Sequence, residues 1–344
     1  GRVRRQEALE RINSLGAEIF REEGRRFWEQ LYERREDLTR RFRESLGQME
    51  GFPVSFRQGC RYLCGSFLWT ELLAGRYRLM VQALGEGYMK EPLQPEVWVE
   101  LEDFFSGLLA AQKLLEKEGR YFGGKISRWD LWNLIRKQAV GHFLAIAFLL
   151  RFQLQKEENQ KEVKELIPPW APRILRLGEY MGEGEVILFL DSRPEGAKRL
   201  KELLKRSFYS PFLLQSHFFG PDRYQKLSAR ERQLQYIAFQ GCRLEQMDFS
   251  GSSLWGARFS GCEITGCTFL GADLAMARFE NCRFQGNDWE EARFLDTLCL
   301  SCLPDGISGE QQEGILTQEE QYDRAIFLCG TGQDGQGLHP SGRV

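Results

Sequence analysis

The sequence predicts a multi-domain protein in which an α-helical N-terminal domain precedes an all-β solenoid of stacked coils. Apolar residues recur at broadly helical spacing through residues 1–165. From residue 239 to residue 294, by contrast, a large apolar residue recurs at every fifth position. The expected organisation is a helical bundle at 1–165, a mixed α/β connector at 166–230, a repeat domain at 231–302 and a polar, partly flexible tail at 303–344.

The helices of the first part are expected from local signals. Residues 1–50 are typical of one or two amphipathic helices, with a break near Gly16 or Gly24. A second helical stretch follows Pro53, through Trp69 and Leu73. The other expected helices are one that begins at Pro95, carries Trp98, Leu101, Phe104 and Phe105 and stops at Gly119, and one at about 128–152 that starts from a capping box of Ser127 and Asp130.

The connector and the tail carry weaker signals. The three prolines of LIPPWAP, residues 166–172, interrupt any helix. EVILFLD, residues 185–191, predicts one buried strand, and Pro194 opens a short helix through Leu204. Residues 207–230 are expected to be irregular, and the glycine-rich tail after Pro304 is expected to be largely mobile.

The repeat domain is defined by one large residue in every five. An α-helix repeats every 3.6 residues and a strand every 2, so neither explains this period. Twelve successive positions, which we call the centres, are Phe239, Leu244, Phe249, Leu254, Phe259, Ile264, Phe269, Leu274, Phe279, Phe284, Trp289 and Phe294. A fixed period of this kind indicates a repeat architecture.

Two further features show how such a chain can fold. The residue two before each centre is mostly small, as in Ala257, Cys262 and Ala272, and glycine often stands two after it. If both the centre and the small residue point inward, the chain turns a corner in each unit, and glycine suits that corner. Only stacking of coils about 4.8 Å apart buries the inward faces.

The units GADLA, MARFE and GARFS resemble the pentapeptide-repeat family, whose motif is A-(D/N)-L-x-x with Phe often replacing Leu. The resemblance covers about residues 235–298, and the N-terminal region resembles no family that we recognise. It implies a right-handed quadrilateral β-helix with four units per coil, so that twelve units make about three coils. Residues twenty apart then stack, which places Phe239, Phe259 and Phe279 in one ladder and Phe249, Phe269 and Trp289 in another.

The nine cysteines are scattered, and no apolar stretch resembles a signal peptide, so we expect a reducing, cytoplasmic location. Cys242, Cys262 and Cys282 would stack in one column. A small side chain in a narrow interior explains them better than a metal ladder, since zinc needs four converging ligands. Cys299 and Cys302 form a lone CxxC, for which a structural role is favoured over a redox or metal role. We expect no metal and no cofactor.

Other candidate catalytic residues are isolated. Asp191 ends the predicted buried strand, where an aspartate more often begins a turn than binds a metal. His142 lies in the apolar run AVGHFLAIAFLL, residues 139–150, which is too short to span a membrane and is expected to be a buried helix. GTGQDG at 330–335 matches a dinucleotide motif only literally, because no helix and acidic residue follow it. We therefore expect no enzyme and no membrane contact.

The favoured function is a non-catalytic protein-interaction scaffold, in which the β-helix and the helical domain present a rigid surface to a macromolecular partner. Trp255, Leu270, Arg258 and Arg278 project outward and form the candidate surface. One alternative is a DNA mimic that modulates a DNA-binding enzyme such as gyrase, as some relatives do, but the repeat region carries 6 Lys/Arg against 10 Asp/Glu, too few negative charges. The second alternative is an unrecognised enzyme or ligand site in residues 1–230. The partner is expected to be a protein, direct nucleic-acid binding is not expected, and the sequence does not predict the oligomeric state.

Overall fold

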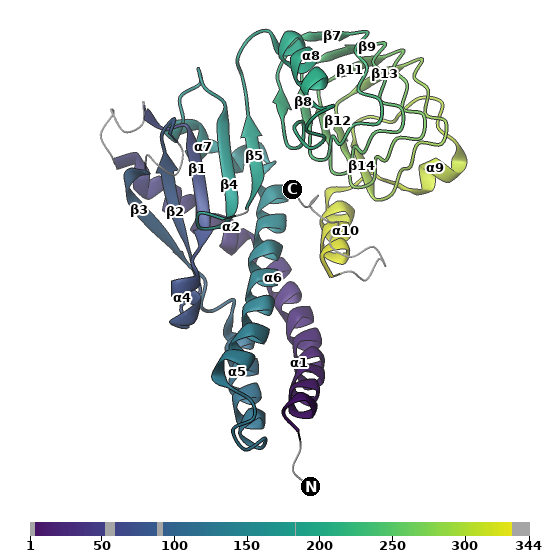
Figure 1. Cartoon of the computed structure of the whole chain (residues 1–344). Helices are drawn as coiled ribbons and strands as arrows, with labels where there is room; N and C mark the ends of the chain where they lie inside the picture. Colours follow the sequence, from purple (N-terminus) through teal and green to yellow (C-terminus); the bar gives the residue numbers. More distant parts are fainter. Residues whose placement is uncertain (1–3, 52–58, 88–91, 183, 332–344) are drawn as a thin grey trace. The chain divides into compact units, whose positions relative to one another are not determined.

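The computed structural model describes residues 4–51, 59–87, 92–182 and 184–331, and it divides into two units that we treat separately (Figure 1). Unit 1 comprises Gly1–Leu166 and Leu175–Ile187, and unit 2 comprises Ile167–Ile174 and Leu188–Val344. The connector predicted at 166–230 is therefore not a separate body, because Leu175–Ile187 belongs with unit 1 and nearly all the rest of the connector belongs with unit 2.

Unit 1 contains long helices, as predicted. They are α1 (Arg5–Glu33), α2 (Arg35–Gly47), α4 (Trp69–Leu73), α5 (Ser106–Arg120), α6 (Arg128–Leu154) and α7 (Lys161–Leu166), with short 3₁₀ turns η1 (Gln48–Gly51) and η3 (Glu157–Asn159). α1, α5 and α6 pack on one another. The capping box is confirmed, since the Asp130 amide donates to Ser127 Oγ at 3.1 Å. No helix in the described residues is long and apolar enough to cross a membrane.

The break expected near Gly16 or Gly24 is wrong, because α1 runs through both glycines and the interruption falls at Arg34. A Cβ at Gly16 would lie 3.4 Å from Leu134, and one at Gly24 would lie 3.1 Å from the Gln138 amide, both on α6. The glycines therefore allow α1 and α6 to approach closely.

The prediction of a helical bundle for 1–165 misses a five-stranded sheet of order β3-β2-β1-β4-β5. Its strands are β1 (Tyr62–Phe67), β2 (Arg78–Leu84), β3 (Pro92–Glu100), β4 (Arg173–Glu179) and β5 (Gly184–Leu190), so the strand predicted at 185–191 is confirmed. The helix predicted from Pro95 is wrong: Pro95 and Trp98 lie in β3, and α5 begins only at Ser106. β3 is an edge strand, where proline is tolerated. Pro53 lies outside the described residues.

Unit 2 is the predicted solenoid. Short parallel strands form two of its sides, and isolated bridges such as Asp248 to Thr268 and Ser253 to Asp273 form the other two. From β6 to β14 each pairing joins residues twenty apart, as in Phe239 to Phe259, whereas the last pairing, of Thr297 with Ile315, joins residues eighteen apart. The strands are β6 (Phe218–Phe219), β7 (Arg223–Gln225), β8 (Ala238–Gln240), β9 (Arg243–Glu245), β10 (Arg258–Ser260), β11 (Glu263–Thr265), β12 (Arg278–Glu280), β13 (Arg283–Gln285), β14 (Thr297–Leu300) and β15 (Ile315–Leu316).

The solenoid has about five turns rather than the three predicted, because it begins at β6 instead of residue 231 and continues through β14 to β15. Residues 218–230, expected to be irregular, belong to the first coil. Its centres are Phe219, Tyr224, Ala229 and Leu234, and the β14 rung uses Cys299. The first coil has Asp222 and Leu227 where the motif wants small residues, and this hides its period.

The predicted centres are interior residues, and both predicted aromatic ladders are confirmed. Phe259 stacks 5.5 Å from Phe239 and 4.8 Å from Phe279, measured between ring centroids, and Phe269 lies 4.3 Å from Trp289. The corner two residues after a centre is left-handed, with φ +59° at Gly261 and +51° at Gln246. Glycine at this corner therefore meets a conformational requirement, as predicted.

Both ends of the solenoid carry helices. α8 (Gly196–Arg206), predicted from Pro194 through Leu204, contacts β7. At the other end lie α9 (Gly309–Glu313) and α10 (Glu319–Thr331), where the Gln311 side chain donates to the carbonyls of Trp289 and Ala292. The tail expected at 303–344 is therefore folded as far as residue 331. The rest of the tail, with His339 and most of GTGQDG, lies outside the described residues.

Candidate interaction surfaces

Where the small position of a repeat carries Cys, Asn or Thr, its side chain donates a hydrogen bond into the preceding coil, a role that the sequence alone did not reveal. The thiols of Cys262 and Cys282 lie 3.3 Å from the carbonyl oxygens of Phe239 and Phe259. Thr297 Oγ1 donates to the Leu274 carbonyl at 2.9 Å. The offset is 23 residues each time, so the acceptor is a centre of the neighbouring coil. These side chains satisfy buried backbone groups.

The cysteines fit this structural role. The bond with the stacked Cys242 thiol, aided by burial, raises the pKa of Cys262 to about 12, and burial raises the pKa of Cys299 to about 12. Metal binding and nucleophilic attack require the thiolate, which these environments disfavour. Cys302 extends the column of small positions, whereas Cys299 occupies a centre. In the described ranges, no group of three or more His, Cys, Asp or Glu residues could hold a metal ion.

Asp191 is completely buried and forms the turn that the sequence favoured. Its Oδ1 accepts from the Arg193 amide at 3.1 Å, and its Oδ2 accepts from Arg193 Nη2 at 2.7 Å. Burial acts to raise the pKa of Asp191, but the bonds from Arg193 outweigh it and the pKa is lowered. The carboxylate is therefore held ionised between Arg193 and Arg199, which is 3.4 Å away. This geometry stabilises the chain where it enters α8.

The four residues of the predicted surface are only partly brought together. Arg258 and Arg278 stack on neighbouring strands, while Trp255 is 2% exposed and packs edge-to-face on Tyr236. Leu270 is 37% exposed and does not lie on the strands that carry Arg258 and Arg278. α10 covers part of this wall: Glu319 pairs with Arg278, and the buried Tyr322 hydroxyl donates to the Met276 carbonyl at 2.8 Å.

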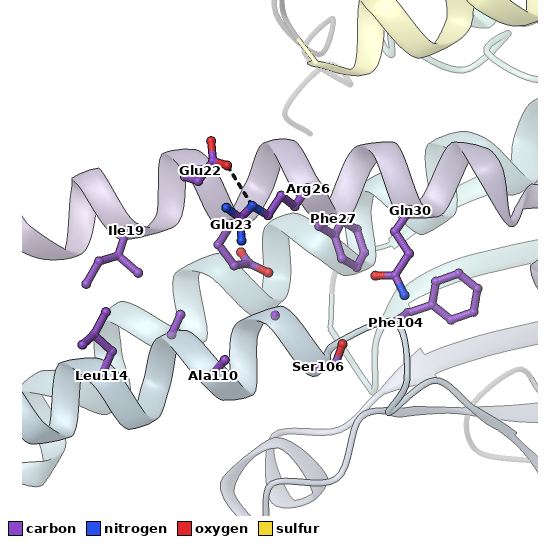
Figure 2. Close-up of a pocket in the computed structure, with 12 residues that line it drawn as sticks. Ile19, Glu22, Glu23, Arg26, Phe27, Gln30, Phe104, Ser106, Ala110 and Leu114 are labelled. Atoms are coloured by element: carbon purple, nitrogen blue, oxygen red, sulfur yellow. Dashed lines mark hydrogen bonds and ion pairs between the residues drawn. The ribbon is translucent and has the colours of Figure 1, made fainter.

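A groove of about 490 Å³ runs between α1 and α5 in unit 1 (Figure 2). Ile19, Phe27, Ala110 and Leu114 give it an apolar lining, and Glu22 pairs with Arg26 at its rim. Its volume falls in the range of small-molecule pockets, roughly 300–1,000 Å³.

Glu23 lies at this groove and is 7% exposed. Its oxygens contact His142 Nε2 at 2.7 and 2.9 Å, and Gln138 Nε2 donates to Oε2 at 2.8 Å. The His142 ring stacks on Phe27 with centroids 3.6 Å apart, so the prediction that it is a packed core residue is confirmed. Sequence reasoning missed Glu23. Its signal is a carboxylate placed on the same helical face as Ile12, Ile19 and Phe27.

A second surface of unit 1, which we call the aromatic face, consists of Trp69, Leu73, Trp129, Trp132 and Arg136. On α6, Trp129 stacks on Trp132 with centroids 4.8 Å apart, and Trp132 meets Trp69 of α4 at 6.3 Å. The Arg136 guanidinium lies 5.0 Å above the Trp69 ring. Trp129 is 60% exposed and Leu73 is 55% exposed.

Local sequence sets this arrangement. Trp129, Trp132 and Arg136 lie at i, i+3 and i+7 on one side of α6, and Trp69 and Leu73 lie at i and i+4 on α4. The Trp69 indole N–H donates to Glu179, which anchors the ring beside β4. Sequence reasoning missed this face because its three segments are far apart in the chain.

The architecture of unit 2 defines a class, namely a four-sided β-solenoid with twenty residues per coil. A family model described as pentapeptide repeats matches residues 233–269 and 248–286, with 8 copies. The repeat region is thus a right-handed quadrilateral β-helix of the pentapeptide-repeat family, and no family model matches the N-terminal helical region.

Solved structures of pentapeptide-repeat proteins are similar to part of the chain. A trypsin-treated form of QnrB1, a plasmid-mediated fluoroquinolone resistance protein, is 19% identical with a TM-score of 0.25, and the match covers 25% of this chain and 45% of that one. HetL, involved in heterocyst differentiation regulation in the cyanobacterium Nostoc sp. strain PCC 7120, is 17% identical with a TM-score of 0.18, covering 27% and 48%. The chain thus spans about half the length of these structures. A search of curated proteins gave no match.

Proposed function

We propose that this chain is a non-catalytic protein-interaction scaffold whose aromatic face binds a protein partner and whose β-helix is a rigid support. The exposed Trp129, stacked on the half-buried Trp132 beside Arg136, carries this proposal. Tryptophan and arginine dominate binding hot spots, and exposed apolar clusters mark interaction sites.

The expected energy of such a contact is substantial. A tryptophan buries about 150–250 Å² of surface in an interface. With Trp129 60% exposed, covering its remaining surface would contribute about 3 kcal/mol at ~25 cal/mol/Å². Trp69 is fixed by Glu179 and Trp132 by its two tryptophan neighbours, so little side-chain entropy would be lost on binding.

The walls of the β-helix do not favour the alternative of DNA mimicry. On the side formed by β7, β9, β11 and β13, Arg223 pairs with Glu245, and Arg243 pairs with Glu263. Arg283 adds a further positive charge that is 85% exposed. Alternating, paired charges differ from the continuous negative charge of duplex DNA, about one per 1.7 Å.

The test is photo-crosslinked capture from nuclease-treated native lysate, with a photoreactive residue in place of Leu73 and identification by mass spectrometry. The full chain is required, because a division at residue 230 would cut the first coil. We expect a discrete protein whose capture falls at least about tenfold in Trp129→Ala, the loss expected for a hot spot.

The matched control is Tyr209→Ala, which removes a 94% exposed aromatic side chain from unit 2. It should capture the partner as well as the parent protein does. Equal capture by the parent and Trp129→Ala would refute the assignment of binding to the aromatic face. Turnover of a substrate by the purified protein would refute the non-catalytic part of the proposal.

A further inference from the structure

Three acidic side chains lie near the aromatic face, and each already has partners. Glu71 is bridged by Arg76 and Arg78, each at 2.7 Å. Glu179 accepts from the Trp69 indole. Asp130 is held by Ser127 Oγ at 2.6 Å and by Arg5. These carboxylates are therefore committed within the fold.

The basic side chains of α6, of which Arg136 belongs to the aromatic face, are in a different situation. Arg128, Arg136 and Lys137 are exposed on α6, and no carboxylate within the described residues forms an ion pair with them. Asp130 is the one acidic residue in the sequence of α6. Arg136 lies over the rings of Trp69 and Trp132, at 5.0 and 5.5 Å, which fixes its position without neutralising its charge.

We infer that the occupant of the aromatic face is an acidic segment of the partner protein, an inference that rests on the proposed function. A carboxylate of this segment would pair with Arg136, and an apolar side chain would pack against Trp129 and Leu73, while Arg128 and Lys137 add positive charge elsewhere on α6. Arginine pairs with carboxylates through two parallel hydrogen bonds, which gives geometric specificity. Complementary charge of this kind speeds association and excludes basic competitors.

The pattern favours an acidic protein over a nucleic acid or a lipid surface. Nucleic-acid affinity depends on many phosphate contacts along a line of cations. Here only three cations stand exposed on this part of α6, and one of them, Arg136, belongs to the aromatic face. A short acidic segment can use a few cations, whereas a nucleic acid or an anionic lipid surface gains its affinity from many such contacts.

The experiment is selection of random short peptides from a display library on the full chain, with counter-selection on Trp129→Ala. We expect the enriched peptides to be rich in Asp and Glu with interspersed Leu, Ile or Phe. Their binding should weaken as salt is raised, because exposed charge pairs are screened. The best peptide should bind Arg136→Gln about tenfold more weakly, which is about 1.4 kcal/mol. The matched control, Arg283→Gln on the solenoid wall, should leave its affinity unchanged.

Each alternative outcome has a distinct meaning. Enrichment of neutral or basic peptides that need Trp129 would overturn the acidic occupant and leave the scaffold proposal standing. Absence of any Trp129-dependent peptide would also overturn it. A third outcome is Arg136-dependent binding of phosphatidylserine vesicles or single-stranded DNA without any peptide enrichment. It would overturn the acidic protein segment and indicate that the face binds a membrane or a nucleic acid. Trp129-independent capture of the partner from lysate would instead be a failure of the scaffold proposal itself.

Discussion

In the β-helix, Phe259 stacks between Phe239 and Phe279, the residues twenty positions before and after it. In unit 1, Phe105 packs against Phe27, Tyr77 and Phe143, which come from three unrelated segments. A periodic sequence repeats each environment, so one residue predicts its neighbours. An aperiodic core gives no such rule, and surfaces such as the aromatic face arise only when distant segments meet.

The comparison predicts that the β-helix is most sensitive at its ladders. Phe259→Ala removes a fully buried ring whose neighbours on both sides are fixed by the coils, and it should cost about 3–5 kcal/mol. Hydrogen exchange followed by mass spectrometry should show increased exchange in the adjacent coils and no increase in unit 1. Gln285→Ala, an exposed wall residue, should stay within about 0.5 kcal/mol of the parent. Increased exchange spread evenly over both units would contradict the expectation that loss of a ladder residue affects only the neighbouring coils.

The junction between α8 and the first coil should be the next most sensitive place. A Cβ at Gly196 would lie 2.2 Å from the Tyr224 hydroxyl, so Gly196→Ala should cost about 1–3 kcal/mol through overpacking. In the double variant with Tyr224→Phe, part of this loss should be recovered, because the hydroxyl is gone. Denaturant unfolding of the two single variants and the double variant measures the coupling. Strict additivity would mean that the clash is relieved in some other way.

The sequence predicted the periodic β-helix better than the aperiodic unit 1. Period five predicted the centres, the ladders and the corners, because each depends on residues at fixed offsets. It did not predict the first coil, because Asp222 and Leu227 occupy positions where the motif has small residues. The sheet of unit 1 was missed because Trp98 and Phe104 fit a helical pattern as well as a strand followed by a turn. The sequence shows Glu23, His142 and the tryptophans as separate residues. Which of them contact one another depends on tertiary packing, which the sequence pattern does not give.

Alkaline pH should weaken the β-helix selectively. The pKa values of Cys262 and Cys282 are raised from 9.0 to about 12, so the folded state keeps protons that the unfolded chain releases. This stabilisation is present below pH 9 and is lost as pH rises from 9 towards 12. Cys262→Ala should flatten the decline by up to about 1.4 kcal/mol per pH unit. Unfolding of the full chain by denaturant at pH 8, 9 and 10 checks this, and identical slopes would show that Cys262 is not responsible.

Acid pH should act on unit 1 instead, with a smaller effect. Hydrogen bonds from Arg76 and Arg78 lower the pKa of Glu71 from 4.5 to about 2. The carboxylate therefore stabilises the fold above pH 4.5, and this contribution disappears as pH falls from 4.5 towards 2. Glu71→Gln should reduce the acid sensitivity of exchange in α4 and β2 while leaving the coils unchanged. If the variant and the parent lose protection in parallel, the pair does not contribute.

Unit 1 is proposed to bind the partner and the β-helix to support it, and one measurement tests that division directly. Hydrogen exchange of the full chain, alone and with its captured partner, reports which backbone amides become protected. We predict new protection in residues 69–73 and 127–137 and unchanged exchange along the walls of the coils. Protection along the coil walls, with residues 127–137 unchanged, would contradict the assignment and return the interaction surface to the solenoid.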